Sequence, residues 1–141
     1  MAQAAETVLH RWFEEVWNQG LESSIDELMA EGALIHGIAT PDGKPMRGAA
    51  DFKPFYQQFR AAFPDMRITV EDMLVDGDKL AARCSVTATH TGPGVMPAGP
   101  TNKAVSITGM CIARVENGKI VEGWNNFDFL SMYQQLGMQL A

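Results

Sequence analysis

Apolar residues recur at helical spacing in the first half of the chain. Within residues 1–17 they occupy one helix face: Val8, Leu9, Trp12, Phe13, Val16 and Trp17. A second stripe, over about 49–63, consists of Phe52, Phe55, Tyr56, Phe59, Ala62 and Phe63. We expect two long helices here, the second ending at Pro64. Between them we expect a short helix over 24–29, a short strand over 33–38 and a turn over 40–45.

The second half of the chain alternates apolar and polar residues, as strands with one buried face do. We expect strands at 66–75, 80–90, 105–115 and 119–127, and a closing helix at 130–136. Asp-Gly and Asn-Gly turns join the first and last pairs of strands, and a loop rich in Gly and Pro spans 91–102. Helices followed by an antiparallel meander predict an α+β fold, a single domain over residues 1–141.

Composition excludes several classes of protein. The net charge is −6 and the 11 Lys and Arg form no basic stripe, which argues against nucleic-acid binding. No apolar run approaches the roughly 20 residues that cross a membrane. Cys84 and Cys111 lie in apolar strand segments, which favours two reduced, buried thiols in a cytoplasmic protein over a disulfide. The three histidines lie far apart without Cys or carboxylate at ligand spacing, so we expect no metal.

Asp128 is the main candidate for chemistry. It follows Trp124 and Phe127 at the end of an apolar strand. A carboxylate among aromatic side chains loses hydration, which raises its pKa toward the range that is useful for proton transfer. The alternative is that Asp128 caps the helix beginning at Phe129, where it would accept hydrogen bonds from free N–H groups. Capping would instead lower the pKa.

Strand parity suggests companions for Asp128. Trp124 and Asn126 share its face, and a three-residue bulged hairpin at Asn117-Gly118 would align that face with Met110, Ile112 and Arg114. We expect a pocket wall from these residues, to which Phe55 and Phe59 of the second long helix would add. Ordinary core packing of Met110 and Ile112 is the alternative.

Three further polar side chains are candidates. Arg83 lies on the polar face of its strand and could steady an oxyanion in the pocket, or form an outward salt bridge. His90, at the entry to the Gly/Pro loop, and His36, in the short strand, could move a proton or bind a carbonyl. Both could equally be structural. The loop itself would form a lip or lid, with Met96 closing over a ligand.

Several segments together resemble the SnoaL-like polyketide cyclases and predicted ester cyclases of the NTF2-like superfamily. They are Ala62-Phe63-Pro64-Asp65, Arg83, Thr89-His90-Thr91-Gly92, the run from Arg114 to Glu122, Trp124, Phe127-Asp128 and Gln135-Leu136-Gly137. The resemblance covers nearly the whole chain.

This resemblance implies an NTF2-like cone, in which N-terminal helices pack on a curved, mostly antiparallel sheet and enclose a pocket. It also implies a homodimer through the outer sheet face, and Asp128 as general acid/base for an intramolecular aldol closure. Limonene epoxide hydrolases share the scaffold with an Asp-Arg-Asp set. Asp128 and Arg83 match two members of that set, and Ser85 occupies the third position. The cyclase loop Pro-Thr-Gly-Lys is Pro100-Thr101-Asn102-Lys103 here.

The candidate residues and the resemblance are compatible with three functions. The first is cofactor-independent acid/base chemistry on a small apolar carbonyl compound, of the cyclase or isomerase kind. The second is an epoxide hydrolase-like enzyme, against which Ser85 counts. The third is a small-molecule binding protein without turnover.

Overall fold

The computed structural model describes residues 4–38 and 42–139. The helices are α1 (Ala5–Arg11), the π-helical η1 (Trp12–Asn18), α2 (Ser23–Leu28), α3 (Gly48–Ala62) and α4 (Phe129–Gln135). The strands are β1 (Met29–His36), β2 (Met46–Arg47), β3 (Arg67–Asp76), β4 (Lys79–Thr89), β5 (Ala104–Glu116) and β6 (Lys119–Phe127). This α+β arrangement confirms the predicted fold class. The short strand begins at Met29, earlier than expected, and residues 40 and 41 of the predicted turn lie outside the described residues.

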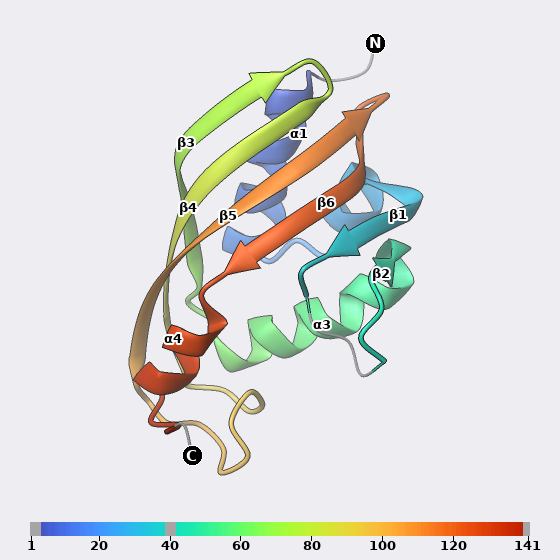
Figure 1. Ribbon diagram of the computed structural model, residues 1–141. Helices are drawn as coiled ribbons and strands as arrows, with labels where there is room; N and C mark the ends of the chain where they lie inside the picture. The colour runs from blue at the N-terminus through green and yellow to red at the C-terminus, as the bar shows by residue number, and fades with distance from the viewer. Residues whose placement is uncertain (1–3, 39–41, 140–141) are drawn as a thin grey trace.

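One mixed sheet forms the body of the molecule, in the order β2-β1-β6-β5-β4-β3. β1 runs parallel to β6, and the other neighbouring strands are antiparallel. The long strands β3, β4 and β5 bend strongly, and α1, η1 and α3 lie on the concave side (Figure 1). Among the described residues, no helix is long and apolar enough to cross a membrane.

The N-terminal helix changes its winding at Trp12, where the α-helix α1 continues as η1. The wider turn is seen in the hydrogen bond that the Gln19 N–H donates to the Glu14 carbonyl, at 2.8 Å. A five-residue repeat brings Trp12 and Trp17 onto one face, and their rings lie 5.2 and 6.0 Å from that of Phe52. The sequence pattern predicts a regular α-helix over this segment. The π-helical turn that is found instead accompanies the packing of the two indole rings against α3.

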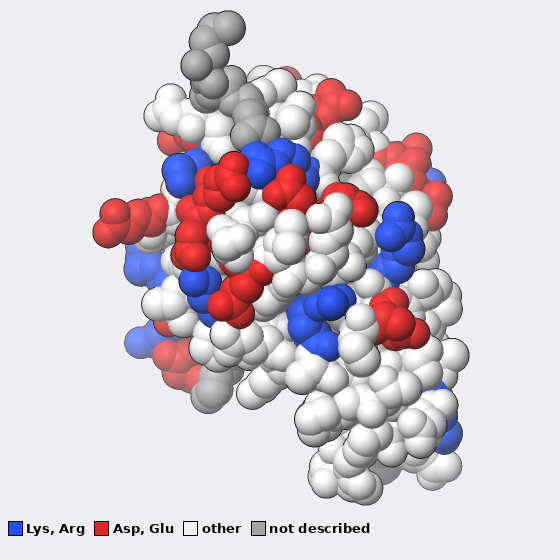
Figure 2. Space-filling view, turned by 180° about the vertical axis from the view of Figure 1, so that it is seen from behind, with Lys and Arg blue, Asp and Glu red and all other residues white. Residues whose placement is uncertain are grey.

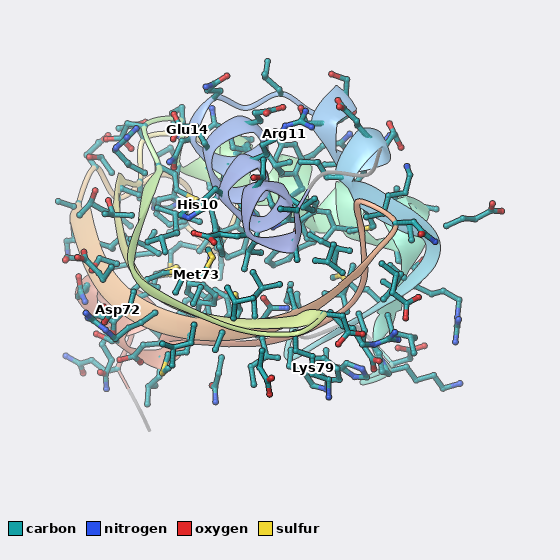
Figure 3. All side chains as sticks on the ribbon, turned by 90° about the horizontal axis from the view of Figure 1, so that it is seen from above. His10, Arg11, Glu14, Asp72, Met73 and Lys79 are labelled. Carbon is teal, nitrogen blue, oxygen red and sulfur yellow. The ribbon has the colours of Figure 1, made fainter. Side chains whose placement is uncertain are left out.

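The concave face of β4 and β5 carries small and medium side chains that are all buried. They are Leu80, Ala82, Cys84, Val86 and Ala88 on β4, and Val105, Ile107, Gly109, Cys111, Ala113 and Val115 on β5. Asp72 and Lys79 lie on the outer side of the sheet, whereas Met73 lies on the side of the helices (Figure 3). The two faces are therefore chemically distinct, as alternating strands require.

The β5–β6 hairpin has the expected register. Asn117 and Gly118 both have positive φ, 52° and 75°, as the two central residues of a type I′ turn do. The register then shifts between Arg114 and Val115, so that Trp124 pairs with Ile112. A tight turn followed by an irregularity replaces the three-residue bulged hairpin, and the predicted alignment is confirmed.

Gly109 is required by the ring of Phe127, its cross-strand partner. A Cβ at Gly109 would lie 2.1 Å from Cδ1 of Phe127. We predict that Gly109→Ala lowers the free energy of unfolding by about 1–3 kcal/mol through overpacking, as measured by urea denaturation. Gly123→Ala on β6 is the matched control, because its added Cβ would meet no atom closer than 3.9 Å. Equal effects of the two substitutions would contradict the prediction.

Candidate functional site

An apolar cavity of about 120 Å³ lies between the helices and the concave face of the sheet. The helices contribute aromatic side chains to its lining, among them Trp12, Phe13, Trp17, Phe52, Phe55, Phe59, Phe63 and Phe129. The sheet contributes smaller ones, among them Val86, Ala88, Val105, Ile107, Cys111, Ala113 and Gly123. The expected contribution of Phe55 and Phe59 to a pocket lining agrees with this geometry.

Several of the aromatic residues that line the cavity are only half-buried. The rings of Phe55 and Phe59 of α3 are tilted against each other with centroids 4.7 Å apart, and Phe59 meets Phe129 of α4 edge-on at 5.8 Å. Phe127 and Ile38 are also half-buried and line the cavity. The half-buried aromatic part of the lining therefore comes from α3, from the end of β6 and from the start of α4.

Few polar groups reach this cavity. Among its described lining residues, the side chains that can hydrogen-bond are Asn125, Cys111 and the indoles of Trp12 and Trp17. Burial raises the pKa of the Cys111 thiol to about 12, so the group remains an uncharged S–H. No lining residue in the described chain carries a carboxylate, imidazole, ammonium or guanidinium group. The interior favours uncharged ligands.

The Trp124 face of the hairpin lies on the opposite side of the sheet. Met110 is 54% exposed and Ile112 is 45% exposed, and Trp124 and Asn126 pair directly with them. Of these four residues of the expected wall, Ile112 alone is among those that line the apolar cavity. Met110, Trp124 and Asn126 lie on the outer face and not around the cavity. The reason is that the inward positions of β5 are taken by the alternate set, including Gly109 and Cys111.

Asp128 lies beside an open hollow on this outer face, together with Arg83, Met110 and Asn126. Its Oδ1 accepts a hydrogen bond of 3.0 Å from the Ser131 N–H, so the residue is the N-cap of α4. Phe127 and Phe129 line both the hollow and the apolar cavity, whereas Asp128 lines the hollow alone.

Arg83 forms a salt bridge with Asp72 on the outer face of the sheet. Its Nε donates to Oδ2 of Asp72 at 2.8 Å, and its side chain is 52% exposed. Ser85 in turn donates to Oε1 of Glu71 at 2.9 Å. The geometry is that of the outward salt bridge considered above.

His36 lies at the end of β1 against the outer face of β6. Its ring stacks on Trp124 with centroids 5.5 Å apart, and its Nε2 lies 2.7 Å from Oε2 of Glu122. The hydrogen bond with His36 is the largest cause that lowers the pKa of Glu122, and Arg114 acts in the same direction. The side chains of His36 and Trp124 lie outside the lining of the apolar cavity.

His90 is fully buried and ties the Gly/Pro loop together. Its Nδ1 accepts from the Thr101 N–H at 3.1 Å, and its Nε2 lies 2.8 Å from the Gly94 carbonyl oxygen. An N–H at Nε2 would donate to that oxygen, which corresponds to a neutral ring with Nδ1 as acceptor. Both ring nitrogens are thus engaged within the protein, as in the structural interpretation of this residue.

Met96 is half-buried against the hydrophobic core but does not line the apolar cavity. Its loop, residues 91–102, contains no charged residue, and neither does the chain from Phe129 onward. Seen from behind, the end of the molecule that contains this loop is almost free of charged side chains (Figure 2). This uncharged end adjoins the aromatic border of the cavity.

Asn125 is a polar residue of the cavity that is absent from the site predicted from the sequence. It pairs with Cys111, and both side chains are on the concave face. The alternation of residues along β5 could have identified it. Gly109, Cys111 and Ala113 face inward, so their partners on β6, which include Asn125, must face inward too. No group of three or more His, Cys, Asp or Glu in the described chain is arranged to hold a metal ion.

Comparison with known proteins agrees with this fold and cavity. The family model of the SnoaL-like polyketide cyclases matches residues 7–136. The chain belongs to the SnoaL-like polyketide cyclase family. A search of the curated proteins finds no match.

Solved structures show the same NTF2-like fold. Wild-type IdmH from Streptomyces antibioticus, provisionally assigned as a polyketide cyclase, is 32% identical, with a TM-score of 0.82 over 96% of this chain and 100% of that one. A provisionally assigned polyketide cyclase from Bacillus cereus is 29% identical, with a TM-score of 0.80 over 96% of this chain and 82% of that one. AclR from Streptomyces galilaeus, provisionally assigned as a hydroxylase, is 24% identical and has a TM-score of 0.82 over 97% and 83%.

The cap made by Asp128 gives a direct test of the structural role of this residue. We predict that Asp128→Ala lowers the free energy of unfolding by about 1 kcal/mol, because the first turn of α4 loses its cap. Asp128→Asn keeps an equally good capping oxygen and serves as the matched control, with stability within about 0.3 kcal/mol of the wild type. Chemical denaturation measures both. Equal losses in the two variants would show that charge, not capping, is what matters.

Proposed function

We propose that this SnoaL-like protein binds a small apolar organic compound in the cavity and promotes its cyclisation or isomerisation without a cofactor. The observation that supports this most is the lining: aromatic from the helices, aliphatic from the sheet, and almost without polar groups. Such pockets bind apolar ligands and fix their orientation with a few polar contacts.

Cavity size narrows the ligand class. An engineered protein cavity of roughly 150 Å³ lined by aliphatic and aromatic residues binds benzene, and the cavity here has about 120 Å³. A single ring or a short folded chain fits this space. Nicotinamide and flavin cofactors are much larger, which favours chemistry carried out on the substrate alone.

The chemistry that this cavity supports is confinement. An apolar wall can hold a flexible substrate chain in a folded conformation, with the reacting atoms of the substrate close together. The conformational entropy that the substrate must lose to react is then lost on binding and not during the reaction. Water excluded from the same space cannot intercept a reactive intermediate. Aromatic side chains from α3 and β6 would set the shape of the folded chain, because Phe55, Phe59 and Phe127 border the cavity.

Proton transfer by Asp128 is the second candidate. The resemblance to the cyclases and the position of Asp128 beside the hollow with Arg83 favour it. A substrate handled this way would have to reach past Phe127 and Phe129, or bind on the outer face. Retention of a ligand without turnover is the outcome expected if neither mechanism operates.

Filling the cavity tests the proposal. We predict that wild-type protein binds toluene, the probe ligand, and that Ala113→Leu weakens this binding at least about tenfold because the added carbons occupy space the ligand needs. Titration followed by NMR measures the affinity.

Ala104→Leu is the matched control, since Ala104 is an exposed residue of the same strand. It should bind toluene as the wild type does. Absence of toluene binding to the wild type, or equal affinities of wild type and Ala113→Leu, would contradict the proposal.

A homodimer through the outer sheet face is a further part of this proposal. Exposed Met110 and Ile112 lie side by side with half-buried Trp124 on adjacent strands, an apolar surface in the middle of the sheet. A second copy of the chain would cover it symmetrically.

We predict a dimer mass by light scattering at micromolar concentration, and a monomer mass for Met110→Glu, because the new charge would be buried at the interface. Leu21→Glu is the control: Leu21 is 43% exposed between η1 and α2, away from the sheet, and its change should leave the dimer intact. A monomeric wild type would overturn this part of the proposal.

A further inference from the structure

Asn125 brings a hydrogen-bond acceptor into an otherwise apolar cavity. Among the described lining residues it is the only one whose side chain carries an oxygen. The other side chains there are hydrocarbon, indole, thioether or thiol. A ligand inside the cavity can therefore donate a hydrogen bond from a hydroxyl group to a side-chain oxygen at one position only.

The amide is held in one orientation by the end of β1. Its Nδ2 donates to the His36 carbonyl oxygen at 3.0 Å. The chain can come this close because residue 37 is glycine with φ of 84°; a Cβ there would lie 1.8 Å from the Asn125 carbonyl oxygen. With Nδ2 committed to His36, the remaining oxygen of the amide is the group that is free to meet a ligand.

That oxygen, Oδ1, has no hydrogen-bond partner among the described residues. It is not sealed off either, because no fully buried side-chain nitrogen or oxygen in the described chain lacks a partner. Oδ1 is therefore not fully buried, and its residue lines the cavity opposite Cys111 on the concave face. Cys111 beside it is a neutral thiol, so no neighbouring charge competes for the ligand.

We infer that Asn125 Oδ1 is the specificity-determining acceptor of the cavity, and that the ligand is an apolar skeleton bearing one hydroxyl or enol group. This inference rests on the proposed function and names its substrate class. On binding, the hydroxyl group of the ligand loses a hydrogen bond to water and donates one to Asn125 Oδ1 in its place. An analogue without the hydroxyl leaves Oδ1 unpaired.

The experiment compares phenol with toluene, two probes of nearly equal size that differ in the hydroxyl. Affinities of both are measured by NMR titration for the wild type, Asn125→Leu and Asn126→Leu. Leucine resembles asparagine in size but cannot accept a hydrogen bond. Asn126→Leu is the matched control, because the neighbouring side chain is exposed on the outer face.

We expect the ratio of phenol affinity to toluene affinity to fall about tenfold or more in Asn125→Leu, because loss of a buried hydrogen bond is worth that much. The ratio should be unchanged in Asn126→Leu. Toluene binding itself should persist in both variants. A ratio in Asn125→Leu that equals the wild-type ratio would overturn the inference while leaving the proposed function standing.

A measurement on the wild type alone covers the case in which Asn125→Leu does not fold. The side-chain NH₂ signals of Asn125 should shift on titration with phenol, and much less on titration with toluene at equal occupancy. Equal shifts with the two probes would overturn the inference. Failure of both probes to bind would overturn the proposed function and this inference with it.

Discussion

The structure depends on a difference in side-chain size across its core. The concave face of β4 and β5 presents Ala82, Cys84, Gly109, Cys111 and Ala113, whereas the helices present tryptophan and phenylalanine. Small residues on the sheet allow the long strands to bend toward the helices, and the rings of the helices fill most of the enclosed space. Aromatic side chains are stiff and planar, so they pack against one another at distances of 4.7–6.2 Å and leave a void where they meet the sheet.

Along the strands, the small side chains of the inner face alternate with polar and aromatic side chains on the outer face. Trp124 stacks on His36, and Arg114 and His36 both approach Glu122. Asp72 pairs with Arg83 farther along. These interactions are solvent-exposed or half-exposed, so each contributes little to the free energy of unfolding. They join side chains of neighbouring strands on the outer face, beside its apolar centre.

Much of this arrangement is predictable from the sequence, because it follows from local patterns. The aromatic stripes, the strand alternation and the Asn-Gly turn determine the helices, the strands and the pairing of Trp124 with Ile112. Period-two alternation separates two faces but does not say which one is concave. Both faces of β5 carry apolar residues, and Met110, Ile112 and Trp124 are larger and therefore more suggestive of a pocket than Gly109, Cys111 and Ala113. The cavity exists because the inward residues are small, which is a tertiary effect.

Asn125 illustrates why the chemistry of such a fold is concentrated in few atoms. The cavity of this protein has an almost entirely apolar lining, and the shape of such a lining selects weakly between ligands that differ by one oxygen atom. A single amide changes this, since its oxygen is either paired by the ligand or left unpaired in apolar surroundings. Holding that amide takes an unusual local backbone, the glycine turn after β1 that lets the His36 carbonyl reach Nδ2.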